Sequence, residues 1–168
     1  MESRTLDYLL TLEDLRQLKY RYLRSVDHKL WDELADTLTE DAVADYGTPA
    51  MGGDNLLLTG RTAIVEFMRK NLGPGLISVH LAGQPELSVN GDQATGTWGF
   101  SDLIIAPEYK VVIQGAAFYE DTYRRGDDGV WRISRTGYTR TYEASMSLDD
   151  LPSFRLTANR WADATANP

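Results

Sequence analysis

Cysteine is absent from this chain of 168 residues, and histidine occurs only twice. Without cysteine there is no disulfide framework and no thiolate that could act as a nucleophile or metal ligand. The two histidines lack the close spacing of a zinc site, and no acidic ligand loop of the calcium type is present. A glycine-rich turn between a strand and a helix is also missing, which argues against a nucleotide cofactor. We therefore expect a protein that works without metal or cofactor.

Positive charge is scarce as well, because 17 Lys and Arg face 25 Asp and Glu and give a net charge of −8. Nucleic-acid binding needs clustered basic side chains, so we expect no nucleic-acid partner. No apolar run approaches the ~18 residues needed to cross a bilayer. The first seven residues show no basic segment followed by an apolar one, so we expect no signal peptide, no membrane contact and a cytoplasmic location.

The first half of the chain has helical patterning. Thr11-Leu-Glu-Asp14 is typical of a helix start, and apolar residues then recur at helical spacing up to Val26. The predicted elements are helices at about 12–27, 30–38 and 59–72, a short strand at 42–46, and a Gly- and Pro-rich loop at 47–55.

From residue 76 the pattern changes to strands. Asn90-Gly91 between two apolar runs is a strong hairpin signal, and long strands are predicted at 111–123 and 130–142. Helices followed by an antiparallel meander indicate a single α+β domain with helices on one face of a curved sheet. Such a sheet leaves a hollow suited to a small molecule. We assign residues 1–147 to this domain and expect the tail, 148–168, to be a lid or a subunit contact.

Asp27 and His80 interrupt apolar segments. A carboxylate turned toward a core costs several kcal/mol unless it is paired, and His80 lies in the otherwise apolar run 76–82. The simplest arrangement is that the two satisfy each other as an acid–base dyad. Imidazole titrates near neutral pH and can remove a proton alpha to a carbonyl, while a carboxylate fixes its tautomer. The alternative is a buried pair with a structural role only.

Tyr22 lies five residues before Asp27, so both can face one cavity only if Asp27 stands where the helix ends. Its phenol could stabilise a developing enolate or simply pack in the core. Tyr138 and Arg140 alternate onto one face of the last strand, opposite Trp131 and Ile133. An inward Arg140 could hold a carboxylate or carbonyl of the substrate, whereas an outward one would be solvated.

Trp98 and Phe118 are candidates for an apolar pocket wall, although a curved sheet also needs such residues for packing. Asp102 shares a strand face with Trp98 and could be a second acid. We favour the alternative, in which Asp102 lies near a strand end in water.

The order of these features resembles the SnoaL-like branch of the NTF2-like superfamily. The resemblance rests on the Tyr–Asp helix followed by Trp31 and Leu34, on Gly60-Arg61, on His80 before Val89-Asn-Gly-Asp-Gln-Ala94, and on Gly129-Val-Trp-Arg-Ile133. It implies a cone-shaped α+β barrel, in which N-terminal helices pack on a strongly curved, mostly antiparallel sheet that encloses a pocket. It spans roughly residues 10–143.

Tyr22, Asp27 and His80 resemble the set found in bile acid 7α-dehydratase, scytalone dehydratase and hexachlorocyclohexane dehydrochlorinase, families in which an Asp–His pair drives a cofactor-free elimination. The resemblance implies that His80 is the general base, that Asp27 orients it and that Tyr22 assists. Scytalone dehydratase uses a second histidine from the sheet, which this chain lacks.

The superfamily hosts several activities, so fold alone does not fix function. The first hypothesis is a lyase acting on an apolar cyclic or aromatic small molecule. The second is an isomerase or cyclase with a steroid- or polyketide-like substrate. The third is a non-catalytic ligand-binding or assembly module. We also expect a homodimer or homotrimer.

Overall fold

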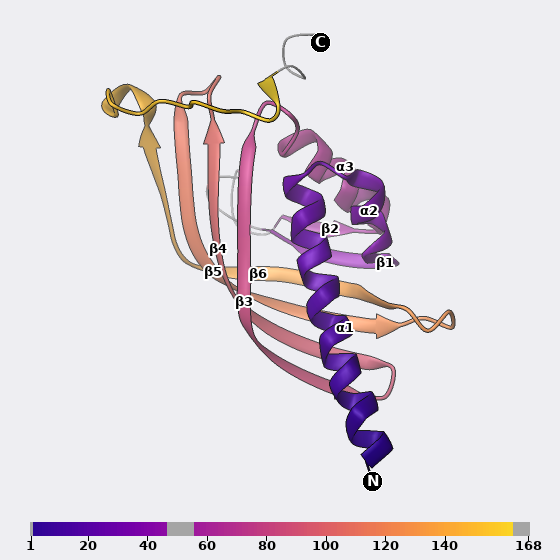
Figure 1. Cartoon of the computed structure of the whole chain (residues 1–168). Helices are drawn as coiled ribbons and strands as arrows, with labels where there is room; N and C mark the ends of the chain where they lie inside the picture. The colour runs from indigo at the N-terminus through magenta and orange to yellow at the C-terminus, as the bar shows by residue number, and fades with distance from the viewer. Residues whose placement is uncertain (1, 47–55, 163–168) are drawn as a thin grey trace.

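Helices cover one face of a mixed sheet in the computed structural model, which describes residues 2–46 and 56–162 (Figure 1). The helices are α1 (Glu2–Asp27), α2 (Trp31–Asp36) and α3 (Arg61–Asn71). The strands are β1 (Leu38–Asp45), β2 (Leu57–Thr59), β3 (Ile77–Asn90), β4 (Gln93–Ala106), β5 (Val111–Arg125) and β6 (Trp131–Ser147), and a 3-10 turn, η2 (Leu148–Asp150), follows.

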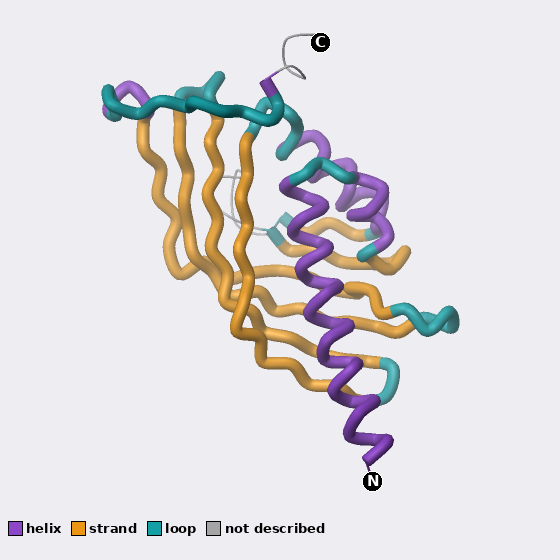
Figure 2. The backbone as a smooth tube through the Cα atoms, in the orientation of Figure 1, coloured by secondary structure: helices purple, strands orange, loops and turns teal. Residues whose placement is uncertain are grey.

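The sheet has the strand order β2-β1-β6-β5-β4-β3, with β2 and β3 at its edges. Neighbouring strands run antiparallel except β1 and β6, which are parallel. Figure 2 shows the long strands bending along their length, so that the sheet curves around the helical layer. The predicted cone-like α+β fold is confirmed. The predicted hairpin joins β3 to β4. Asn90 pairs with Gln93, and the turn between them consists of Gly91, which has a φ of 61°, and Asp92.

The limits of the first two helices differ from the prediction. Helix α1 begins at Glu2 rather than near residue 12, because the segment before Thr11 contains neither Gly nor Pro to end it. Helix α2 ends at Asp36, where the Thr37 hydroxyl donates to the Leu34 carbonyl at 2.6 Å. The predicted loop at 47–55 lies outside the described residues.

The core lies where α1 crosses the concave face of the sheet. Helix α1 presents a buried stripe there, composed of Leu15, Leu18, Tyr22, Leu23 and Val26. Each fully buried Leu or Val side chain contributes about 1.5–3 kcal/mol. Helices α2 and α3 close the β1 side of the sheet with Leu34 and Ile64, both fully buried.

Strand β6 contains two β-bulges, at Ser134 and Thr141, where it has one residue more than β5. Because side chains alternate with a period of two, each bulge moves the inward-facing set by one position. The inward side chains are therefore Trp131, Ile133, Thr136, Tyr138, Arg140 and Glu143. The prediction that Tyr138 and Arg140 lie opposite Trp131 and Ile133 is wrong for this reason.

After η2 the described part of the tail is extended and mostly exposed, and it runs past the ends of the long strands (Figure 1). Near its end the Trp161 ring lies 5.7 Å from the Lys29 ammonium, at the C-terminal end of α1. Its role as lid or subunit contact stays a prediction.

Candidate active site

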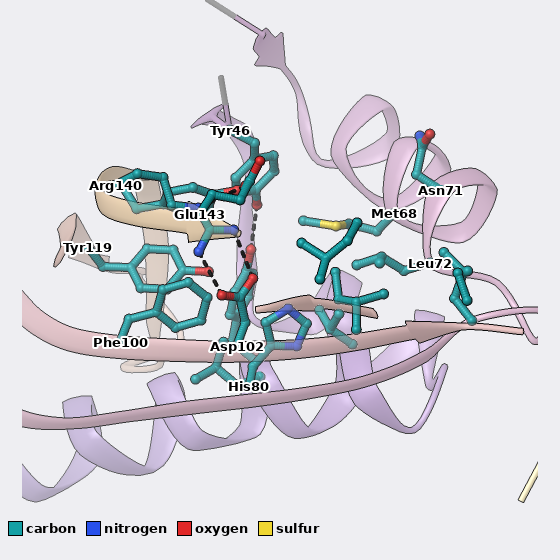
Figure 3. Close-up of a pocket in the computed structure, with 18 of the residues that line it drawn as sticks. Tyr46, Met68, Asn71, Leu72, His80, Phe100, Asp102, Tyr119, Arg140 and Glu143 are labelled. Atoms are coloured by element: carbon teal, nitrogen blue, oxygen red, sulfur yellow. Dashed lines mark hydrogen bonds and ion pairs between the residues drawn. The ribbon is translucent and has the colours of Figure 1, made fainter. Parts of the chain in front are cut away.

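A cavity of about 470 Å³ lies between α1, α3 and the concave face of the sheet (Figure 3). Part of its wall is aliphatic and includes Leu23, Met68, Leu72 and Ile113. The rest is polar or aromatic and includes Tyr22, Tyr46, His80, Asp102, Arg140 and Glu143. Such a mixture suits a mostly apolar ligand with a few polar atoms.

Asp27 and His80 meet at one side of this cavity. Helix α1 ends at Asp27, as predicted, and His80 Nδ1 lies 2.5 Å from Asp27 Oδ1. Tyr22 and His80 line the cavity, and Asp27 reaches it through His80. The His80 backbone N–H donates to Asp27 Oδ2, and the Ser78 hydroxyl donates to Oδ1, both at 2.8 Å. The predicted contact is therefore present. Because Nδ1 is engaged by the carboxylate, Nε2 is the ring nitrogen left to accept a proton from a ligand.

The neighbours of His80 keep its ring in place. Its side chain is only 9% exposed, and the ring stacks on Phe100 with 5.7 Å between centroids and 10° between planes. Ser78 and His80 are two residues apart on β3, so both point to the same face as Asp27. The second histidine, His28, is exposed, as expected for a residue adjacent to Asp27 on the helix end.

Tyr22 and Tyr46 form a pair of buried phenols in the cavity wall, with their hydroxyls hydrogen-bonded to each other. Burial raises the pKa of Tyr22, although its hydrogen bond with Tyr46 acts in the other direction. Burial also raises the pKa of Tyr46 well above its ordinary value. Both are therefore neutral at physiological pH. One O–H is used in the hydrogen bond between them, and the other is left to donate to a ligand oxygen.

Sequence reasoning missed Tyr46. It directly follows β1, where Ala42 and Ala44 are fully buried, so the alternation of the strand turns the tyrosine inward as well. That alternation was the available signal.

A row of cross-strand neighbours carries the polar side of the cavity. The register places His80 opposite Asp102, Asp102 opposite Gly115, and Gly115 opposite Glu143. The Arg140 guanidinium lies over Gly115, where an added Cβ would be 2.5 Å from Arg140 Nη1. The glycine therefore makes room for the arginine.

Arg140 is held by two carboxylates. Its Nη1 and Nη2 donate to Asp102 at 2.6 and 2.8 Å, and its Nε lies 3.3 Å from Glu143 Oε2 (Figure 3). The Asp102 side chain is 3% exposed, so the prediction that it lies in water near a strand end is wrong. Arg140 does point inward, but its charge is already compensated. Sequence reasoning missed Glu143.

The remaining predicted wall residues have different outcomes. Tyr138 lines the cavity, and burial raises its pKa to about 12. Phe118 is 53% exposed, because the inward residues of β5 are its odd-numbered neighbours, such as Ala117 and Tyr119. Trp98 is fully buried but lies beneath α1, 6.0 Å from the Tyr20 ring. The prediction is wrong for Phe118 and Trp98.

A second charged pair, Lys19 and Asp121, lies within the core. Lys19 Nζ is 2.8 Å from Asp121 Oδ2, and both side chains are 0% exposed. Tyr123 and Thr136 donate to the same carboxylate at 2.9 and 2.7 Å. Burial lowers the pKa of Lys19, and the neighbouring Asp121 opposes that shift. Sequence reasoning missed this pair, although Lys19 has helical spacing with the buried Leu15.

Among residues 2–46 and 56–162, no three His, Asp or Glu side chains are grouped as a metal site would require. Within the same ranges, no helix is long and apolar enough to span a membrane.

Comparisons with known proteins agree with this architecture. A SnoaL-like domain matches residues 7–137. An uncharacterized protein of Mycobacterium tuberculosis is 29% identical over 135 residues, covering 79% of this chain and 87% of that protein.

Two solved structures are similar in fold. A hexachlorocyclohexane dehydrochlorinase has a TM-score of 0.74 at 23% identity, covering 85% of this chain and 93% of its own. A structure described as a putative scytalone dehydratase, from Novosphingobium aromaticivorans, has a TM-score of 0.74 at 19% identity, covering 83% and 90%. The chain belongs to the SnoaL-like domain family, within the NTF2-like superfamily.

Proposed function

We propose that this protein is a cofactor-independent lyase that eliminates water, or another β leaving group, from a mostly apolar cyclic or aromatic small molecule. The observation that carries the proposal is the 2.5 Å contact between Asp27 and His80, which places His80 in the wall of a mostly apolar cavity. The similarity in fold between this protein and a dehydrochlorinase and a putative dehydratase supports the same reaction class.

In the proposed reaction His80 Nε2 removes a proton alpha to a carbonyl. The C–H electron pair becomes the new double bond between the α and β carbons, and the bond from the β carbon to the leaving group breaks with its electrons. Asp27 holds the imidazole through Nδ1 and stabilises the imidazolium that forms. When the leaving group is hydroxide, the proton held by His80 completes a water molecule.

The phenol of Tyr22 donates a hydrogen bond to the carbonyl oxygen as negative charge develops there, and Tyr46 supports it through their shared hydrogen bond. Arg140 and Tyr138 line the polar end of the cavity, together with Asp102 and Glu143. Because Asp102 and Glu143 already compensate Arg140, we propose an uncharged substrate rather than a carboxylate.

An isomerase or cyclase is the second candidate, and the tyrosine pair favours it equally. Both reactions begin with the same proton removal and the same enolate, but the leaving group stays in place or is absent. Product mass separates the two classes, because only elimination lowers it.

The test uses a panel of cyclic β-hydroxy and β-chloro ketones, followed by product mass and by the absorbance of the conjugated enone. The proposal expects turnover by the wild type and by His28→Gln, and its loss in His80→Gln and Asp27→Asn. Isomerised or cyclised products would favour the second candidate. Equal rates in all four proteins would contradict a catalytic dyad.

We also propose self-association through the outer face of the sheet. Large apolar side chains are exposed on it, among them Leu81 at 65%, Phe118 at 53% and Tyr142 at 49%. Light scattering of the wild type is expected to give a dimer or trimer, and Leu81→Asp with Phe118→Asp a monomer. A monomeric wild type would refute this.

A further inference from the structure

The C-terminal end of α1 has a lysine where helices usually place glycine. Leu30 N–H bonds the Ser25 carbonyl at 2.9 Å and Lys29 N–H bonds the Val26 carbonyl at 3.2 Å, which together form a Schellman motif. Lys29 lies at its left-handed position with a φ of 58°. Side chains with a Cβ are disfavoured there, so glycine would suit the backbone better.

The lysine side chain is also placed at a cost. It is half-buried, and burial lowers the pKa of Lys29 to about 8, although Asp27 acts in the other direction. The Trp161 ring covers it from the tail at 5.7 Å. A residue that is unfavourable both in backbone and in solvation is most simply explained by what its side chain contacts.

That contact leads directly to the dyad. Lys29 Nζ donates to Ser78 Oγ at 3.3 Å, and Ser78 Oγ donates to Asp27 Oδ1 at 2.8 Å. Asp27 Oδ1 is the same oxygen that lies 2.5 Å from His80 Nδ1. The ammonium, the hydroxyl, the carboxylate and the imidazole thus form one chain of polar contacts, in which each bond polarises the next.

We propose that Lys29 is a positioning residue of the dyad. Its ammonium fixes the Ser78 hydroxyl on Asp27 and adds a positive charge beside the carboxylate. The consequence for catalysis rests on the proposed function, whereas the electrostatic effect on the dyad does not.

The direction of the effect follows from the charges around His80. Asp27 contacts it directly, and Asp102 lies opposite it on β4 with its charge compensated by Arg140. Glu143 completes that cluster on β6, and on the tail Arg160 lies over the Trp161 ring. A positive Lys29 near this group opposes a second positive charge on the imidazole ring.

The test is an NMR titration of the imidazole signals without any substrate. Only His28 and His80 contribute signals, and His80→Gln assigns them. In Lys29→Met we expect the midpoint of the His80 titration to rise by about 0.5–1 pH unit, and the exposed His28 midpoint to rise less. Lys29→Arg should restore the wild-type midpoint, because it keeps the charge.

Lys110→Met is a matched control, since Lys110 is also left-handed, with a φ of 52°, but its ammonium contacts Asp149 on the surface. It should leave the His80 midpoint unchanged. Lys29→Gly adds a test of stability, because it relieves the backbone while removing the charge. We expect its thermal unfolding midpoint to be no lower than that of the wild type, with the same rise in the His80 titration.

An unchanged His80 midpoint in Lys29→Met would overturn the inference. So would a Lys29→Gly protein that unfolds at lower temperature and titrates like the wild type, because Lys29 would then act on stability alone. A shifted titration in a protein that turns over no ketone would refute the proposed function and leave this inference standing.

Discussion

Asp27 and Asp121 are two inward carboxylates, each in an ion pair that involves helix α1. Asp27 ends this helix and contacts His80 on β3, whereas Asp121 on β5 contacts Lys19 on the helix. The two carboxylates differ in what surrounds them. The Asp121 side chain is 0% exposed, and its donors are Lys19, Tyr123 and Thr136. The Asp27 side chain is 17% exposed, and its partner His80 lines a cavity. The partners of Asp121 are buried in the core, whereas Asp27 orients His80, a side chain that a ligand in the cavity can reach.

This difference separates a structural ion pair from a functional one. A buried charge that loses its partner is strongly destabilising, so removing either Lys19 or Asp121 should lower the stability of the fold. A histidine at a cavity wall can exchange a proton with a ligand without rearrangement of the core. A buried ionisable pair alone does not identify a functional site, because structural ion pairs are buried too. The pair must also lie at a cavity that a ligand can enter.

The largest expected effect is on turnover. His80→Gln removes the base, and a positioned base is typically worth about 10²–10⁴-fold in rate. We expect a loss of that size in steady-state assays with any substrate found in the ketone panel. His28→Gln, which changes the other histidine, should retain the wild-type rate. A loss below tenfold in His80→Gln would remove His80 from the mechanism.

The next effect is on stability, at the other pair. Lys19→Met leaves the Asp121 charge buried without its cation, which should cost about 3–5 kcal/mol of unfolding free energy. Chemical denaturation measures this loss. The double variant Lys19→Met with Asp121→Asn should recover part of it, because no charge is then left alone. A double variant as unstable as the sum of the singles would contradict the pairing.

A smaller effect is expected at the floor of the cavity. In Gly115→Ala the new Cβ would lie 2.5 Å from Arg140 Nη1 and 2.9 Å from the Tyr142 carbonyl oxygen, so Arg140 must move off Asp102. We expect a loss of about 1–3 kcal/mol in denaturation. Gly83→Ala is the control, since nothing lies within 4 Å of its Cβ. Equal stability of the two variants would contradict the claim that a Cβ at position 115 displaces Arg140.

The smallest effect is a pH dependence at Lys29. Burial lowers the pKa of Lys29 to about 8 from 10.5, so between these values the unfolded chain holds the proton that the folded chain has lost. The contribution of Lys29 to stability therefore rises as the pH rises from about 8 to 10.5. Thermal unfolding of the wild type relative to Lys29→Met should show this gain. Parallel curves for the two proteins would contradict the lowered pKa.

Much of the site could be predicted because Asp27 and His80 each interrupt an apolar segment and so need a partner. The helix end at Asp27 and the hairpin at Asn90-Gly91 depend on neighbouring residues in the sequence, so they can be predicted from the sequence alone. The resemblance to the SnoaL-like branch supplied the rest of the fold.

What could not be predicted depends on register between distant strands. The bulges at Ser134 and Thr141 shift β6 twice, and without them Glu143 and Arg140 cannot be placed on one face. The partnership of Asp102 with Arg140 follows from that shift. Trp98 was misplaced because the path of α1 over the sheet decides which inward residues are covered and which line the cavity.

The most direct measurement compares the same substitution in the two carboxylates. Thermal unfolding of Asp27→Asn and Asp121→Asn should be recorded in one buffer. The account predicts that Asp121→Asn unfolds about 10 °C below the wild type, because Lys19 is left charged in the core, and that Asp27→Asn falls by no more than about 3 °C. Equal losses, or a larger loss in Asp27→Asn, would show that the Asp27–His80 pair serves the stability of the fold, as the Lys19–Asp121 pair does.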